Sequence, residues 1–234
     1  MIELQDLRFR WPGATADTVA IDALRIEAGR SVFLHGPSGC GKSTLLGLLA
    51  GVLLPQRGQV SLLGTEWAAL SSARRDAFRA HHVGYVFQQF NLLPYLNVLD
   101  NVLLPCRFSA ERRARAAAAA GTADLAARRL LDQVGIGQPL WTRAASLLSV
   151  GQQQRVAAAR ALIGSPELLI ADEPTSALDA ALRDGFMDLL LAQCRATGST
   201  LVFVSHDERL AAHFDERVSL PAINRAAAAM EPTA

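Results

Sequence analysis

The sequence is poor in cysteine and has no long hydrophobic run. Its longest apolar stretch, residues 45–54, ends at Pro55, whereas a membrane-spanning helix needs roughly 20 apolar residues. No charged segment followed by an apolar one opens the chain, so we expect a cytoplasmic protein that is neither secreted nor inserted by itself. The cysteines are few, far apart and without the C-x-x-C spacing of a zinc site, which predicts reduced thiols at Cys40, Cys106 and Cys194.

Net charge is nearly absent, and so is lysine. The 23 Lys and Arg residues almost balance the 22 Asp and Glu residues, which argues against a broad nucleic-acid surface and so against a direct nucleic-acid partner. Lys42 is the single lysine, and arginine supplies every other cationic side chain. A tight phosphate loop can enclose a compact ammonium on a flexible stem better than a planar guanidinium. Lys42 is therefore a candidate phosphate ligand.

Two kinds of strand pattern occur along the chain. Residues 2–11 and 21–29 alternate apolar and polar side chains, which predicts two antiparallel strands. Four later runs are nearly continuous and apolar, as in parallel strands buried on both faces: SVFLHG, VGYVFQ, LLIAD and TLVFVS. Helical patterns lie between these runs, at residues 42–50, 72–80, 152–162 and 182–195. This order predicts an α/β fold with a mostly parallel sheet.

We interpret residues 1–234 as one domain with an insertion. Residues 90–148 are rich in alanine and arginine and have no strand-like run, which predicts an inserted α-helical subdomain. Its apolar stripe is formed by Leu125, Leu130, Leu131 and Val134. The catalytic core is then formed by residues 1–89 and 149–220, with an antiparallel β subdomain near 1–30, and residues 221–234 form a loosely held tail.

The strongest local motif is GPSGCGKS, residues 36–43, which fits G-x-x-x-x-G-K-[ST] between a predicted strand and a predicted helix. Its glycines let backbone N–H groups face phosphate oxygens, Lys42 reaches the β- and γ-phosphates, and Ser43 can hold Mg²⁺. A chance glycine-rich turn would not need this flanking strand and helix. We expect nucleotide contacts at Gly36, Pro37, Ser38, Gly39, Cys40, Gly41, Lys42, Ser43 and Thr44.

Two adjacent acids end the run LLIADE. Asp172 lies at the carboxyl end of a predicted buried strand, where its carboxylate can reach a metal ion beside a phosphate loop. Glu173 either caps the turn before Pro174 or acts as the general base that polarises an attacking water. Its place beside the metal carboxylate favours the general base.

The wider set of motifs resembles the ATP-binding cassette (ABC) ATPases over nearly the whole chain. LSVGQQQ is similar to the signature motif through Ser149, Gly151 and Gln152. The other matching positions are the glutamine-loop residue Gln88, the D-loop SALD at residues 176–179, the switch histidine His206 and the aromatic residue Trp11. At Val150 the family pattern usually has glycine, and a β-branched residue narrows the allowed backbone. We expect function to be retained there, with altered closing geometry and rate.

This resemblance implies a P-loop NTPase fold with a RecA-like core, ATP and Mg²⁺ as ligands, and a head-to-tail homodimer. Ser149, Gly151 and Gln152 would then act in trans on the ATP of the partner subunit, with Asp179 nearby. Gln88 would help to hold Mg²⁺ and, like His206, position the reacting groups, while Trp11 would stack on adenine. The alternatives are a capped surface helix at the signature, a histidine that merely ends a strand, and a partly buried tryptophan beside a Pro-Gly turn.

The stretch FQQFNLLPYLNVLDNVLLP is similar to the branch of the family that includes the MacB, LolD and FtsE ATPases. The resemblance implies transport-coupled ATP hydrolysis on the inner face of the membrane, with the helical subdomain docked on a separate permease. One alternative is ATP-driven mechanotransmission that regulates a cell-envelope enzyme without moving a substrate. A soluble cassette acting on nucleic acid or the ribosome is a weaker one, because the chain has neither long coiled coils, nor zinc cysteines, nor a second cassette.

Overall fold

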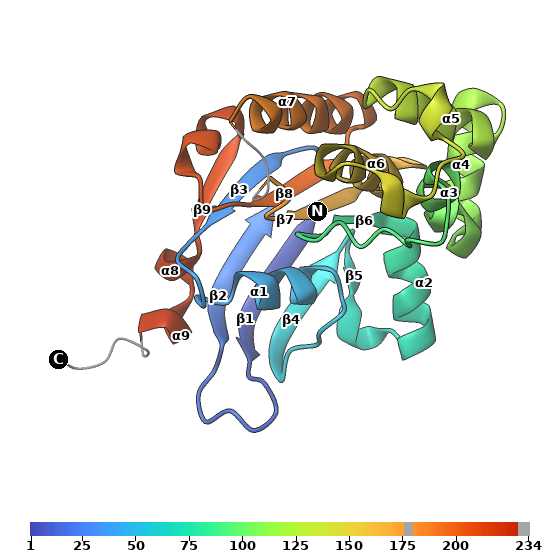
Figure 1. The fold of residues 1–234 in the computed structure, drawn as a ribbon. Helices are drawn as coiled ribbons and strands as arrows, with labels where there is room; N and C mark the ends of the chain where they lie inside the picture. The colour runs from blue at the N-terminus through green and yellow to red at the C-terminus, as the bar shows by residue number, and fades with distance from the viewer. Residues whose placement is uncertain (176–179, 229–234) are drawn as a thin grey trace. The chain divides into compact units, whose positions relative to one another are not determined.

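The structure, a computed structural model, describes residues 1–175 and 180–228 (Figure 1). The chain divides into two compact units, one formed by Met1–Arg79 with Val202–Ala234 and the other by Ala80–Leu201. It passes between them within α2 (Ser72–His82) and within β8 (Thr200–Val204).

The first unit begins with an antiparallel sheet of strand order β2-β1-β4-β5, formed by Val19–Ile26, Ile2–Phe9, Arg57–Leu62 and Thr65–Glu66. β1 pairs with β2 from Ile2 opposite Ile26 to Phe9 opposite Val19, so the predicted antiparallel strand pair is confirmed. The alternating apolar side chains of β1 form its buried face. Helix α1 (Lys42–Leu49) contacts β4 (Figure 1), and a short 3-10 helix, η1 (Trp67–Ala69), follows β5.

The same unit contains the strand order β8-β3-β9, in which β3 (Ser31–His35) pairs in parallel with β9 (Glu216–Ser219). Phe33, Phe203 and Phe214 pack ring against ring at centroid separations of 5.3–6.4 Å. After β8 comes a 3-10 helix, η4 (Glu208–His213), and the short helices α8 (Leu220–Ile223) and α9 (Arg225–Ala228) follow β9.

The prediction of a loosely held tail from residue 221 is wrong for residues 221–226. Asn224 and Ala226 are buried, and α9 contacts β2. The Asn224 amide accepts a hydrogen bond from the Ala20 N–H at 2.7 Å and donates to the Thr18 carbonyl oxygen at 3.0 Å. A buried side-chain amide is stable only where its polar atoms are paired, and these backbone partners hold the segment in place.

In the second unit β6 (Val83–Val86) and β7 (Leu168–Asp172) pair in parallel, from Val83 opposite Leu168 to Val86 opposite Ala171. α6 (Val150–Leu162) contacts both β6 and α7 (Ala180–Thr197). α6 begins two residues before the predicted start at residue 152 because the Ser149 side chain caps it.

Residues 90–148 contain three α-helices, α3 (Val98–Phe108), α4 (Ala110–Ala120) and α5 (Ala123–Gln133), and two short 3-10 helices, η2 (Gln138–Leu140) and η3 (Ala145–Leu147). Gly121, with φ of 93°, separates α4 from α5 in the alanine-rich stretch. Leu131 and Val134 are buried in the core that these helices form with α6. Leu125, the first residue of the predicted apolar stripe, is exposed.

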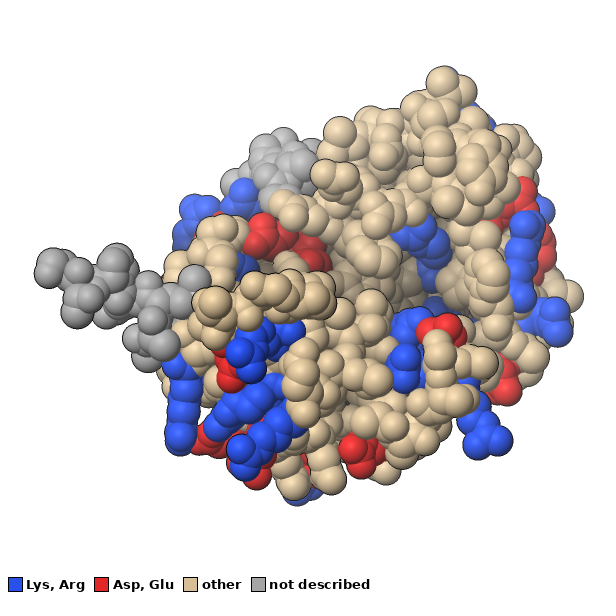
Figure 2. Space-filling model, turned by 90° about the horizontal axis from the view of Figure 1, so that it is seen from below, with Lys and Arg blue, Asp and Glu red and all other residues tan. Residues whose placement is uncertain are grey.

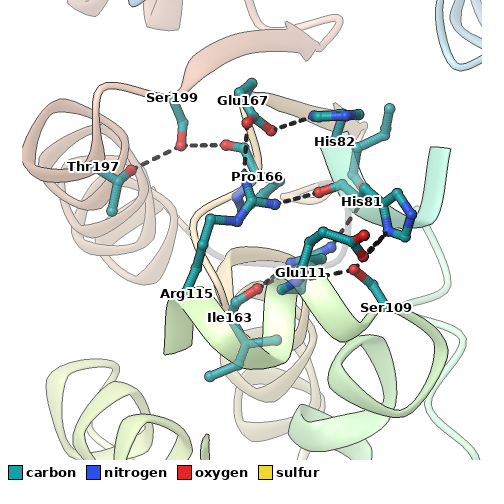
Figure 3. Close-up of polar contacts among 12 residues, drawn as sticks. His81, His82, Ser109, Glu111, Arg115, Ile163, Pro166, Glu167, Thr197 and Ser199 are labelled. Atoms are coloured by element: carbon teal, nitrogen blue, oxygen red, sulfur yellow. Dashed lines mark hydrogen bonds and ion pairs between the residues drawn. The ribbon is translucent and has the colours of Figure 1, made fainter. Parts of the chain in front are cut away.

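A polar network fastens α4 at the amino-terminal ends of β6 and β7 (Figure 3). Arg115 donates to the Glu167 carboxylate at 2.6 Å and to the carbonyl oxygen of His81 at 2.5 Å. His82 Nδ1 lies 2.9 Å from the other Glu167 oxygen. His81 Nδ1 lies 3.0 Å from the Glu111 carboxylate, so several titratable groups meet at this edge of the sheet.

Beside this network the side chain of Arg112 is almost fully buried. Its guanidinium donates to the carbonyl oxygens of Val83, Ala161 and Ile163, at the start of β6 and the end of α6. Burial lowers the pKa of Arg112 to about 10.

Across the described part of the chain, none of the helices combines the length and apolar character needed to cross a bilayer. Cys40, Cys106 and Cys194 are free thiols, as predicted. Burial raises the pKa of the Cys194 thiol to about 12.

Candidate nucleotide-binding site

The phosphate loop joins β3 to α1 in the first unit. Gly39 and Gly41 have φ of 80° and 101°, a region that side chains strongly disfavour. A Cβ atom at Gly36 would lie 2.7 Å from Cys40 Sγ, and one at Gly41 would lie 3.0 Å from the Thr18 carbonyl oxygen. The loop therefore needs glycine for its backbone conformation at two positions and for close packing at Gly36.

The ammonium of Lys42 lies inside this loop. Its Nζ donates to the carbonyl oxygens of Gly36 and Pro37, each at 3.0 Å, and the residue is 7% exposed. Ser43 is exposed and Thr44 is buried. An enclosed cation next to an exposed hydroxyl, at the amino-terminal end of α1, is suited to phosphate oxygens and an accompanying metal ion.

Trp11 is attached to the same loop and helix. Its indole Nε1 lies 3.3 Å from Thr44 Oγ1, to which it donates a hydrogen bond, and its ring meets Phe9 edge to face at 5.2 Å. The residue remains 46% exposed. The hydrogen bond and the contact with Phe9 fix the orientation of the Trp11 indole, and much of its surface is free to stack on a planar base. Adenine stacking stays a prediction.

The loop is also supported by Asn224, which the sequence analysis missed. Its Nδ2 donates to the carbonyl oxygen of Cys40 at 3.1 Å, and the side chain is 1% exposed. A single buried asparagine has no periodicity or spacing that would show such a role in the sequence.

A cavity of about 390 Å³ lies beside the loop in the first unit. The predicted residue His206 is one of its lining residues and is exposed. The cavity is lined by His35, Gly36, Pro37, Ser205, His206, Glu208, Ser219 and Pro221. The structure therefore brings His206 and the first two loop residues to the same cavity, within one unit.

Asp172 and Glu173 lie at the carboxyl end of β7 in the second unit. The hydroxyl of Tyr85 on β6 hydrogen-bonds to Asp172, and burial together with this carboxylate raises the pKa of Tyr85 well above its usual value. Glu173 has φ of 47°, a left-handed conformation that is unfavourable for a glutamate and is common at functional sites. Tyr85 belongs to none of the sequence motifs, so nothing in the sequence indicated its contact with Asp172.

Gln88 is exposed two residues after β6 ends. Phe90 and Asn91, two and three residues after Gln88, have left-handed backbone conformations with φ of 60° and 49°. Arg160 on α6 donates to the carbonyl oxygens of Phe90 at 2.5 Å and Asn91 at 2.7 Å. Burial lowers the pKa of Arg160 to about 10. Arg160 therefore ties the loop after Gln88 to the helix that starts at the signature.

The signature forms the capped amino-terminal end of α6. Ser149 Oγ accepts from the Gln152 N–H at 3.3 Å, and Gln152 Oε1 accepts from the Ser149 N–H at 3.0 Å, a reciprocal capping box. Gly151 lies in the first turn of the helix, not before it as expected from the predicted start, and Val150 is 49% exposed. Gln154 donates to the Pro174 carbonyl oxygen at 2.9 Å, which links α6 to the residue after Glu173.

Each unit thus assembles part of the predicted site. Within the first unit lie the phosphate loop, Trp11 and His206; within the second lie Gln88, Asp172, Glu173 and the signature residues. Asp179, with the rest of the D-loop, lies outside the described residues.

On the face drawn in Figure 2, basic and acidic side chains are interspersed.

A strand leading into a glycine loop that encloses a lysine, followed at once by a helix, defines the class of P-loop nucleotide-binding proteins. The family model described as ABC transporter matches residues 21–176. The chain belongs to the ABC transporter family, and the resemblance that the motifs indicated is confirmed.

Its relatives include ATP-binding proteins of several systems. The chain is 43% identical over 197 residues to YbbA of Escherichia coli (strain K12), an uncharacterized ABC transporter ATP-binding protein, covering 84% of this chain and 83% of the relative. It is 40% identical over 225 residues to the lipoprotein-releasing system ATP-binding protein LolD of Novosphingobium aromaticivorans, covering 94% and 96%. It is 39% identical over 222 residues to the macrolide export ATP-binding/permease protein MacB of Rhodopirellula baltica, covering 94% of this chain and 32% of that larger protein.

Among solved structures, the chain resembles the dimeric ATP-binding cassette MJ0796 in a post-hydrolysis state bound to ADP and Pi. The TM-score is 0.80 at 32% identity, with 94% of each chain covered. This likeness, with the antiparallel and parallel sheets and the helices described above, confirms the predicted α/β P-loop NTPase fold.

Proposed function

We propose that this chain is the ATP-binding subunit of an ABC transporter and hydrolyses ATP with Mg²⁺. The observation that carries the proposal is the Lys42 ammonium, 3.0 Å from the carbonyl oxygens of Gly36 and Pro37 inside the phosphate loop. Relatives named as ATP-binding proteins support it, as does the MJ0796 cassette, which was solved with ADP and Pi.

In this proposal the loop residues and Lys42 bind the phosphates, and Trp11 stacks on adenine. Ser43, Gln88 and Asp172 would hold Mg²⁺, which would supply positive charge to the phosphate oxygens. Hydroxyl, amide and carboxylate oxygens are ligands that Mg²⁺ accepts, and Ser43 is exposed at the amino-terminal end of α1 where phosphate is expected.

Glu173 is the proposed general base. A water oxygen attacks the γ-phosphorus while the bond to the leaving ADP oxygen breaks, and the proton of the water passes to the Glu173 carboxylate. The left-handed backbone at Glu173 supports a functional role. Such a conformation costs free energy, and residues that keep it are concentrated at active sites. His206 positions the γ-phosphate or the water.

The working form in this proposal is a head-to-tail homodimer. Ser149, Gly151 and Gln152 then contact ATP bound to the partner subunit, because α6 begins there and the amino-terminal end of a helix attracts phosphate. The solved MJ0796 cassettes are dimeric, which supports a dimer here. Val150, with its exposed side chain, would lie at the same contact and affect closure.

A membrane permease is the proposed partner, with the helical subdomain of residues 90–148 as its docking region and the chain on the cytoplasmic face. Exposed aromatic side chains in and next to this subdomain support a protein contact: Phe87, Tyr95 and Phe108. The similarity to LolD and MacB favours transport. The alternative, ATP-driven regulation of an envelope enzyme, uses the same residues and differs only in the partner.

Replacing Glu173 with glutamine tests the proposal. Glutamine cannot take a proton, so turnover should fall by a factor on the order of 100 or more, while ATP binding persists and sedimentation at saturating Mg-ATP shows dimers. Asp132→Asn, at an exposed carboxylate on α5, is the matched control and should hydrolyse ATP normally. Wild-type turnover in Glu173→Gln would exclude this base, and monomers alone would contradict the trans arrangement.

Affinity capture of Glu173→Gln from solubilised native membranes, with and without Mg-ATP, tests the partner. An integral membrane protein with a large extracytoplasmic domain supports the permease assignment, and an envelope enzyme recovered with it favours the regulatory alternative. Recovery of soluble proteins or nucleic acid alone would contradict both.

A further inference from the structure

Three side chains of the first unit, His35, Glu208 and Arg217, form a closed ring of contacts beside the phosphate loop. Arg217 donates from Nε to His35 Nε2 at 3.1 Å and from Nη2 to Glu208 Oε2 at 2.7 Å. His35 Nδ1 lies 3.4 Å from the other carboxylate oxygen, Oε1. None of the three belongs to a motif that pointed to nucleotide binding, so the known motifs leave this ring unexplained.

The donors of the ring assign the tautomer of His35. The Nε of arginine always carries a hydrogen and can only donate, so His35 Nε2 must accept. The proton of a neutral imidazole then resides on Nδ1, which faces Glu208. The imidazole also stacks on Phe33 at 6.0 Å, and its side chain is 13% exposed. One orientation of the imidazole is therefore held by a ring stack and by contacts at both nitrogens.

Two members of the ring are close in sequence to parts of the candidate site. His35 ends β3 and immediately precedes Gly36, whose carbonyl oxygen accepts from Lys42. Glu208 lies two residues after His206, and both line the cavity of about 390 Å³ together with His35. The ring therefore joins the segment that carries the phosphate loop to the segment that carries His206.

We propose that His35 is a positioning residue for ATP hydrolysis, which holds His206 at a set separation from the phosphate loop through Glu208 and Arg217. The inference rests on the proposed function, because it takes His206 to act on the γ-phosphate or the attacking water. Small displacements of reacting groups lower the rate of the chemical step. The contacts of the Lys42 ammonium with Gly36 and Pro37 do not involve the ring, so we expect ATP affinity to be unchanged without it.

Two substitutions separate the polar contacts of His35 from its packing. His35→Phe keeps a ring stacked on Phe33 but has no nitrogen, whereas His35→Gln is neutral and keeps one acceptor and one donor. We expect His35→Phe to lower kcat about three- to tenfold, as loss of ordinary hydrogen bonds does, with KM and ATP affinity unchanged. His35→Gln should restore most of the turnover.

Arg217→Met tests the same ring from its more exposed side, since the Arg217 side chain is 48% exposed. It should lower kcat to a similar extent, and the double variant with His35→Phe should show little further loss, because residues that act through one network are not additive. Independent, additive losses would overturn the proposal. Thermal unfolding shows whether His35→Phe folds. If it does not, Arg217→Met tests the proposal by the same criterion, a lowered kcat at unchanged KM.

Assays of the wild-type protein and of His206→Ala distinguish failure of the proposed function from failure of the role proposed for His35. If the wild type does not hydrolyse ATP, or His206→Ala turns over normally, the proposed function or the role of His206 fails and the inference falls with it. If both behave as proposed while His35→Phe matches the wild type, the inference alone is wrong. A raised KM at constant kcat in His35→Phe would also overturn it.

Discussion

The side-chain amide of Asn224 donates a hydrogen bond at 3.1 Å to the carbonyl oxygen of Cys40, in the middle of the phosphate loop. The same amide donates to the Thr18 carbonyl oxygen, and its Oδ1 accepts from the Ala20 and Ala226 N–H groups. One buried side chain thus joins the loop, β2 and the start of α9. The phosphate loop depends on a residue close to the far end of the described chain.

Replacing Asn224 with alanine should therefore weaken both stability and nucleotide binding. Several buried backbone groups would lose their partner, at a cost of about 1–3 kcal/mol in the free energy of unfolding. Urea unfolding and ATP titration measure the two effects. Ala222→Ser, at an exposed position on α8, is the control and should change neither. A stable Asn224→Ala protein with normal ATP affinity would show that the loop does not need this support.

Trp11 allows a test of adenine stacking against simple burial. If the indole stacks on the base, Trp11→Ala should weaken ATP binding by an amount equivalent to about 1–3 kcal/mol, and Trp11→Phe should keep most of the affinity. Calorimetric titration with ATP measures the difference. Loss of thermal stability in Trp11→Ala without loss of affinity would instead favour a partly buried structural tryptophan.

Arg112 should be among the most sensitive positions in the second unit. Arg112→Met leaves the buried carbonyl oxygens of Val83, Ala161 and Ile163 without their donor, and should lower the free energy of unfolding by about 3–5 kcal/mol. Arg112→Lys should rescue little of this loss, because an ammonium cannot reproduce the planar set of donors. The exposed neighbour Arg113 is the control, and Arg113→Met should unfold in urea like the wild type.

Glu167 should make the free energy of unfolding depend on pH in the acidic range. Burial alone would raise the pKa of its carboxyl, but the hydrogen bond from His82, a backbone hydrogen bond and the charges of Arg115 and His82 together lower it. A carboxyl with a lowered folded-state pKa stabilises the protein above its unfolded pKa of about 4.3. That stabilisation is lost as the pH falls through the folded-state value.

Glu167→Gln removes this titration. The variant should be less stable than the wild type at pH 7, by about 1 kcal/mol since the group is partly exposed, and the difference should shrink below about pH 4. Chemical unfolding across this pH range measures it, with Asp132→Asn as the control. An unchanged difference at every pH would mean that the Glu167 charge contributes nothing to folding.

The sequence by itself determined the features whose signal is local. Strand and helix periodicity located β1, β2, β3, β6, β7 and β8, and motif spacing identified the phosphate loop and the acids at the end of β7, because each depends on neighbours within a few residues. Helix boundaries depend on caps that periodicity does not show: a cap at Ser149 starts α6 two residues before the predicted start, and Gly121 divides the alanine-rich stretch into two helices.

The tertiary structure alone decided the contacts between residues far apart in the chain. Asn224 beneath the phosphate loop, the ring of His35 with Glu208 and Arg217, and Arg112 at the carbonyl oxygens of Val83 and Ala161 all pair distant segments. Hydrogen bonds of this kind leave no periodicity in the sequence, because the fold, and not the spacing along the chain, brings donor and acceptor together.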